Sequence, residues 1–153
     1  MKKFQFTPEG FKKLEAEYHD LVKNKRPAAV IRLTKARSMG DLSENSEYHA
    51  AKEELAFADG RVKEIEVLMK NSEIIDPGET EGISIGTKVT VEKNGTIESF
   101  MIVGEFEADP TQKKLSATSP IGKSLLGKKP GESIKVKVPV GILKYTIKEI
   151  KKT

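Results

Sequence analysis

The sequence has no cysteine and few aromatic residues, which make up 6% of the chain. The lack of cysteine excludes disulfide bonds and thiolate metal sites, and it fits a reducing compartment. Long apolar runs are missing too, because no stretch approaches the roughly 20 residues that a membrane-spanning helix needs. The first ten residues, MKKFQFTPEG, also lack the apolar core of a signal peptide. We therefore expect a cytoplasmic protein that has no membrane partner.

Motifs of self-contained enzymes are missing as well. No Ser, His and Asp arrangement has supporting context, there is no Walker-type phosphate loop, and no glycine fingerprint opens a helix after a strand. His49 precedes Glu53 by four residues, a spacing that would place both on one helical face, but no third metal ligand accompanies them. The sequence therefore argues against an enzyme that works alone.

Charge is abundant and unevenly distributed. Of the 153 residues, 33% are charged and 37% are hydrophobic, which is typical of one folded domain or two small ones. The formal net charge is +4; residues 1–78 hold 14 basic and 14 acidic side chains, and residues 79–153 hold 13 and 9. A basic run without acids leads up to position 40, and an acidic run follows it: Lys23, Lys25, Arg26, Arg32, Lys35 and Arg37, then Asp41, Glu44, Glu47, Glu53 and Glu54. The basic run either steers a phosphate backbone or pairs with acids on a facing helix.

Helical periodicity in the first half predicts a long antiparallel coiled-coil hairpin. The first helix is predicted to begin at a Thr7 cap followed by Pro8 and to end at Gly40. Its apolar phase slips near Pro27, where we expect a kink or a break. The apolar positions are Phe11, Leu14, Tyr18 and Leu21 before the slip, Val30, Ile31 and Leu33 after it, and Tyr48, Ala51, Leu55, Ala58, Val62, Ile65 and Met69 in the second helix. Arms of about 30 residues would be on the order of 45 Å long.

The second half predicts a small, mostly antiparallel β domain with one short helix, so the fold class is α+β. Asp76-Pro77-Gly78 ends the helical region, and we place the hairpin at residues 1–76, a linker at 77–82 and a globular domain at 83–153. Asn94-Gly95 is a two-residue loop of the kind that closes a β-hairpin. The expected strands are Lys88–Val91, Thr96–Val103, Lys114–Thr118, Ile134–Val138 and Leu143–Ile150, and the expected helix or turn is Ile121–Leu126.

Asp41 and Glu44 lie at the predicted bend of the hairpin, at residues 41–44. Their spacing is that of a capping box, in which both side chains bond backbone N–H groups at the start of a helix. The same carboxylates suit Mg²⁺, which takes about six oxygen ligands and commonly only one or two protein carboxylates. Two acids are half of such a site. We therefore expect no metal bound by the chain alone, and any catalytic use would need a partner that supplies the other ligands.

Two separated motifs resemble the bacterial Gre transcript cleavage factors. The first is GDLSEN at residues 40–45, with YHAAK at 48–52, and the second is SPIGK at 119–123, with LLGK at 125–128. The resemblance runs over the whole chain. It implies an N-terminal antiparallel coiled coil and a C-terminal domain similar to the FK506-binding isomerase fold.

The resemblance also implies a function and a partner. The hairpin would enter the secondary channel of RNA polymerase in backtracked complexes, and the polymerase would then cut the 3′ end of its own transcript. Asp41 and Glu44 would help to hold the second Mg²⁺ of that centre, which suits a two-metal hydrolysis. Arg37 and Lys52 would contact the extruded RNA, and Ser119 and Pro120 would dock on polymerase. Without the resemblance, these are exposed charges near a bend and a turn that starts a helix.

Two other functions stay open at this point. A channel-binding inhibitor would share the fold, although such relatives tend to depart at the tip where this chain keeps Asp41 and Glu44. A prolyl isomerase would need an apolar proline pocket, for which 6% aromatic residues provide little material. We expect a monomer, and the sequence does not decide whether Met39 packs on the bend or contacts polymerase.

Overall fold

The computed structural model describes residues 3–41, 44–79 and 81–152 and divides into two compact units. Unit 1 takes in the chain up to Phe11 and from Ser72 onward, and unit 2 is Lys12–Asn71. This division differs from the predicted hairpin over 1–76, because the first residues and those after Ser72 group with the sheet. No helix in the described part of the chain is long and apolar enough to span a membrane.

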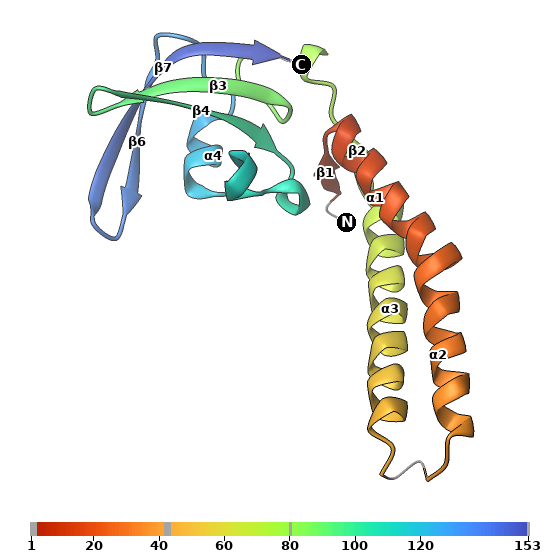
Figure 1. Ribbon diagram of the computed structural model, residues 1–153. Coiled ribbons are helices and arrows are strands. Elements are labelled where there is room, and N and C mark those ends of the chain that lie inside the picture. The colour runs from red at the N-terminus through yellow and green to blue at the C-terminus, as the bar shows by residue number, and fades with distance from the viewer. Residues whose placement is uncertain (1–2, 42–43, 80, 153) are drawn as a thin grey trace. The chain divides into compact units, whose positions relative to one another are not determined.

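The first arm of the hairpin runs without interruption from residue 8 to residue 38 (Figure 1). It consists of the α-helix α1 (Pro8–Asp20), the π turn η1 (Leu21–Lys25) and the α-helix α2 (Arg26–Ser38). The Oγ1 atom of Thr7 accepts a hydrogen bond from the Gly10 N–H at 3.0 Å, which confirms the predicted cap. The second arm is α3 (Ser46–Lys70), antiparallel to α2.

Pro27 does not break the first arm, so that part of the expectation was wrong. The N–H of Arg26 bonds to the Leu21 carbonyl, five residues back, and this wider turn lies just before the proline. A proline ring normally clashes with the carbonyl four residues back, and the π turn alters the backbone in that stretch. The buried positions Leu14, Leu21, Ala29 and Ala36 show the result, since the spacing is seven, then eight, then seven. The extra residue of the π turn accounts for the phase slip in the sequence.

Small side chains line the centre of the hairpin. Ala29, Ala36 and Ala51 are fully buried, and Ala58 is 4% exposed. Because alanine projects little beyond the backbone, these positions suit closely packed helices. The predicted seam of α3 is confirmed, although it also uses Leu68, which the three-and-four spacing left out.

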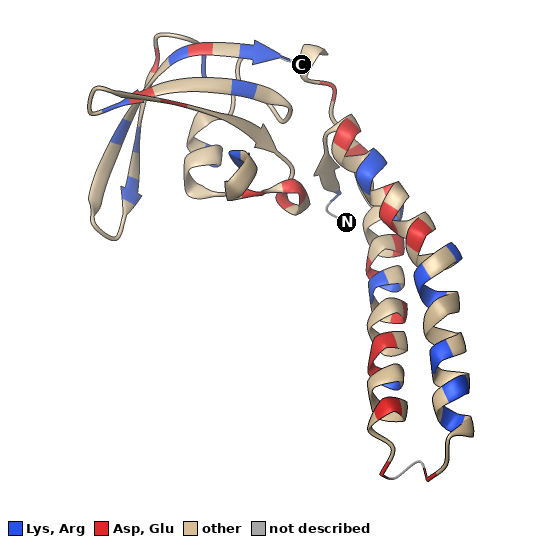
Figure 2. Ribbon diagram, in the orientation of Figure 1, with Lys and Arg blue, Asp and Glu red and all other residues tan. Residues whose placement is uncertain are grey.

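Ion pairs connect facing helices along the hairpin, as the pairing alternative predicted. Figure 2 shows Lys and Arg gathered on α2 and Asp and Glu along α3. Arg32 contacts Glu47 at 2.6 Å and Glu54 at 2.5 Å, and Arg26 contacts Asp59 at 2.5 Å. These pairs account for part of the basic run only. Among the described residues, Lys23, Lys35 and Arg37 have no ion-pair partner.

A pH dependence follows from the pair between Arg61 and Glu17, whose atoms lie 2.6 and 2.7 Å apart. The hydrogen bonds from Arg61 lower the pKa of Glu17. A carboxyl with a lowered folded-state pKa stabilises the fold above its ordinary pKa of about 4.3 and loses that effect as the pH falls. Glu17→Gln should therefore cost about 0.5 kcal/mol at pH 7, because the pair is partly exposed. Near pH 3 the cost should vanish. Thermal unfolding followed by circular dichroism measures both, and a cost that persists at pH 3 contradicts the assignment.

Unit 1 is built around a five-stranded sheet in the order β5-β4-β3-β7-β6 (Figure 1). The strands are β3 (Thr87–Lys93), β4 (Thr96–Val103), β5 (Lys114–Ser116), β6 (Ser133–Val138) and β7 (Gly141–Lys152), with β4 and β5 parallel and the other pairs antiparallel. Asn94 and Gly95 have φ values of 52° and 82°, as the predicted hairpin turn requires. The α+β prediction is thus confirmed, with one parallel pair in the sheet.

The core of unit 1 lies between one face of the sheet and the helix α4 (Pro120–Leu125). Leu125 is fully buried, as are Val89, Val91, Ile102 and Ile147 of the strands. Alternation in β6 buries Ile134 and Val136 and exposes the lysines between and beside them. The core thereby fixes α4, which carries the second motif of the sequence.

A small parallel sheet of β1 (Phe4–Phe6) and β2 (Ser72–Ile74) was not predicted. Phe6 is 1% exposed, and its ring lies 6.1 Å from that of Phe11 and 6.3 Å from that of Phe106. Glu107 accepts hydrogen bonds from the N–H and the hydroxyl of Thr7. Three short 3₁₀ turns complete unit 1: η2 (Pro77–Glu79), η3 (Glu105–Glu107) and η4 (Pro110–Gln112).

Candidate functional site

The connection between α2 and α3 carries the two predicted acids. α2 ends at Ser38, and the N–H of Met39 bonds the Ala36 carbonyl at 3.1 Å. Gly40 follows with φ of +129°, as the predicted helix end requires. Asp41 and Glu44 are both exposed, and the residues between them, 42 and 43, lie outside the described part of the chain. Both carboxylates are therefore available to a partner from solvent.

Asn45 joins the two helix ends at this connection. Its Oδ1 atom accepts from the N–H of Tyr48 at 3.0 Å and caps α3, and its Nδ2 atom donates to the Ala36 carbonyl of α2 at 2.7 Å. The helix begins at Ser46, so the capping alternative for Asp41 and Glu44 placed the cap four residues too early. Both acids lie before the cap. Sequence reasoning missed Asn45, although an asparagine before the helical pattern is itself a capping signal.

The double role of Asn45 leads to a graded prediction. Asn45→Asp keeps an acceptor for the Tyr48 N–H but loses the donor to Ala36, whereas Asn45→Ala loses both bonds. We expect Asn45→Ala to destabilise the hairpin by about 1–2 kcal/mol and Asn45→Asp by roughly half of that. Urea unfolding followed by circular dichroism measures the difference. Equal effects of the two substitutions would show that the Ala36 bond contributes nothing.

The basic residues predicted to contact RNA lie on both arms near the connection. Arg37 is exposed in the last turn of α2, and among the described residues it has no ion-pair partner. Lys52 is exposed on α3, and its Nζ atom lies 5.5 Å from the centre of the Tyr48 ring. Met39 is 74% exposed and so does not pack against the bend. The cation of Arg37 is thus free to meet a phosphate.

No self-sufficient metal site is found in the part of the chain that the structure describes, where no three His, Asp or Glu side chains are grouped to hold an ion. This covers His49 and Glu53. Asp41 and Glu44 still fit a shared Mg²⁺ ion, because exposed carboxylates are the hard oxygen ligands that Mg²⁺ takes in ones and twos. The pair can therefore complete a site that another molecule provides.

Ser119 and Pro120 begin α4 in unit 1. The Ser119 hydroxyl accepts from the Gly122 N–H at 3.1 Å and donates to the Ser116 carbonyl at 2.7 Å. Pro120 is exposed in the first helical position. The bland interpretation as a helix-starting turn is thus correct, and it leaves the exposed face of the turn available for docking.

Comparisons with known proteins agree over the whole chain. A family model described as "Transcription elongation factor, N-terminal" matches residues 4–74, and one described as "Transcription elongation factor, GreA/GreB, C-term" matches residues 78–152. Curated relatives named transcription elongation factor GreA include one from Caldanaerobacter subterraneus subsp. tengcongensis, 47% identical, covering 95% of this chain and 96% of that protein. Another, from Clostridium acetobutylicum, is 46% identical and covers 98% of both. A crystal structure of GreA factor homolog 1 of Thermus thermophilus is 26% identical, with a TM-score of 0.47, and covers 98% of this chain and 99% of that one.

Proposed function

Because the chain belongs to the GreA/GreB family of transcription elongation factors, we propose that it binds RNA polymerase and stimulates cleavage of the nascent RNA in backtracked complexes. The observation that carries the proposal is the connection between the helices, where Asp41 and Glu44 are exposed and precede the cap of α3. The hairpin enters the secondary channel, and the polymerase supplies the catalytic centre. The protein is then a factor for another enzyme's nuclease activity.

The acids act as ligands that the polymerase centre lacks. Asp41 and Glu44 bring carboxylate oxygens to a weakly held Mg²⁺ ion that polymerase groups bind from the other side. When bound, that metal lowers the barrier to hydrolysis by activating water and stabilising the leaving oxygen. Asn45 contributes by fixing the ends of both helices, so that the acids start from a defined backbone. Preorganised ligands lose less entropy on assembly than mobile ones.

Other residues bind and orient the partner molecules. Arg37 and Lys52 attract the phosphates of the extruded RNA, a contact that carries no sequence preference. Ser119 and Pro120 dock on polymerase through the turn that begins α4, whose shape the Ser119 hydrogen bonds hold. Unit 1 thereby contributes affinity, and the tip of unit 2 contributes to the chemistry.

The test is a cleavage assay with purified RNA polymerase stalled in a backtracked state on a labelled transcript. Adding the protein is expected to shorten the RNA from its 3′ end at a rate well above that of polymerase alone, in proportion to the bound fraction. Binding with slower cleavage would instead support the channel-binding inhibitor. Absence of both binding and cleavage would refute the proposal.

A further inference from the structure

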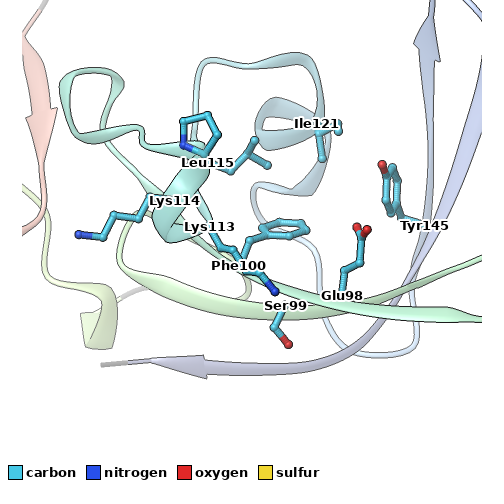
Figure 3. A pocket seen from close by; sticks show the side chains of 9 residues that line it. Glu98, Ser99, Phe100, Lys113, Lys114, Leu115, Ile121 and Tyr145 are labelled. Atoms are coloured by element: carbon cyan, nitrogen blue, oxygen red, sulfur yellow. The ribbon is translucent and has the colours of Figure 1, made fainter.

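A pocket of about 310 Å³ lies on unit 1, on the side of the sheet that faces α4 (Figure 3). Its apolar surface comes from three elements: Phe100 of β4, Leu115 of β5 and Ile121 of α4. The volume is at the lower end of the range of ligand pockets, which is roughly 300–1,000 Å³. It therefore suits one or two side chains and is small for an extended cofactor.

Tyr145 of β7 provides a polar group in this pocket. The residue is only 4% exposed, and the Nζ atom of Lys93 lies 5.9 Å from the centre of its ring. Its hydroxyl forms no hydrogen bond with any residue that the structure describes. Among those same residues, no side-chain oxygen is both sealed from solvent and without a partner. The Tyr145 oxygen is thus reached through the pocket, from a side chain that is otherwise buried.

Glu98 of β4 provides the complementary polar group. Figure 3 shows its carboxylate beside the Tyr145 ring, at the edge of the apolar surface formed by Phe100. An ionised carboxylate only accepts hydrogen bonds, whereas a tyrosine hydroxyl also donates one. The pocket thus offers one acceptor and one donor next to an apolar floor. A single peptide unit has the matching N–H and C=O groups.

We propose that this pocket binds a short polypeptide segment of a protein partner through one compact apolar side chain. The side chain rests on Phe100, Leu115 and Ile121, the segment's C=O accepts from Tyr145, and a neighbouring N–H donates to Glu98. A non-peptide apolar ligand would leave both polar groups unpaired, which costs binding free energy. The proposal does not rest on the proposed function in transcription, because the pocket is formed within unit 1 alone.

The occupant differs from what sequence reasoning considered. The small aromatic content argued against an apolar pocket, yet Phe100 and Tyr145 lie far apart in sequence and are brought together here by β4 and β7. Binding in this form needs no bond rotation in the ligand. Prolyl isomerase activity is a separate hypothesis that stays a prediction.

The experiment follows the backbone amide signals of the full-length, isotope-labelled protein by NMR. The probe is N-acetyl-leucine N-methylamide, which has one apolar side chain between two peptide units, and the matched control ligand is N-acetyl-glycine N-methylamide. We expect saturable shifts centred on residues 98–100, 115, 121 and 145 with the leucine probe, and none with the glycine compound. Shifts without saturation, or shifts centred on another surface, would overturn the proposal.

Two substitutions then separate the hydroxyl from the rest of the pocket. Tyr145→Phe removes an oxygen that has no partner among the described residues, so the fold should be unaffected, and binding of the leucine probe should weaken about fivefold. Tyr18→Phe removes a hydroxyl from α1 and should bind the probe as the parent protein does. Equal affinity of Tyr145→Phe and the parent would overturn the proposed hydrogen bond and, with it, recognition of a peptide unit.

Discussion

Replacing Asp41 by Asn together with Glu44 by Gln should lower stimulated RNA cleavage by at least about 100-fold while leaving polymerase binding nearly unchanged. Both substitutions keep side-chain size and remove only the negative charge that would bind Mg²⁺. Metal ions contribute several kcal/mol to such a transition state, and about 2.7 kcal/mol corresponds to 100-fold in rate. The acids are exposed and precede the helix cap, so their neutralisation should not unfold the hairpin.

The measurement combines a cleavage assay on backtracked polymerase with a separate binding titration. Glu53→Gln is the matched control, because it neutralises another exposed carboxylate of α3 and should cleave as the parent does. Higher Mg²⁺ concentrations should restore part of the activity of the double variant, since weaker ligands still bind an abundant ion. Normal cleavage by the double variant at low Mg²⁺ would refute the metal role of these acids.

Gly122→Ala should destabilise unit 1 by about 3 kcal/mol, the largest stability effect that we expect of one methyl group. A Cβ atom at this position would lie 2.0 Å from the Ser116 carbonyl oxygen and 3.0 Å from the Cα atom of Ala117. Both are backbone atoms, so no flexible side chain can move aside. Overpacking a core typically costs 1–3 kcal/mol, and a collision with backbone belongs at about the upper end of that range. The turn of Ser119 and Pro120 would shift with α4.

Urea unfolding followed by tyrosine fluorescence measures this effect in unit 1. Tyr145 is the only tyrosine of unit 1, and replacing Tyr18 and Tyr48 by Phe leaves it as the sole reporter. Gly127→Ala is the control, because its φ of +80° is unfavourable for alanine but its Cβ atom would meet nothing within 4 Å. Its cost should be about 1 kcal/mol. If Gly122→Ala costs no more than Gly127→Ala, the close approach does not constrain the fold.

Much of the hairpin could be predicted because its signals are local and periodic. The Thr7 cap, the end at Gly40 and the seam of α3 all depend on residues a few positions apart. Pro27 was misread because the sequence shows only that a proline interrupts the phase. Whether the backbone responds with a break or with a π turn depends on packing along the whole arm, which keeps Ala29 and Ala36 buried.

The parts that could not be predicted depend on contacts between distant residues. β1 and β2 are three residues each and pair across nearly 70 positions, so neither carries a period long enough to recognise. The acids of the site were identified as a pair, but their place before the helix cap depends on Asn45, whose amide reaches the Ala36 carbonyl nine residues back. The pocket at Tyr145 likewise needs β4, β5, α4 and β7 together.

The discontinuity of unit 1 has a consequence for how this chain is made and how it can be engineered. Phe4–Phe6 emerges first from the ribosome but waits for its pairing partner, Ser72–Ile74, until the whole of unit 2 has been synthesised. Unit 2 is thus a cassette inserted between two neighbouring strands of another folding unit. Such insertions are tolerated when both ends of the insert return to the same place. Cassettes exchanged between relatives at residues 11 and 72 should therefore fold without redesign of the recipient sheet.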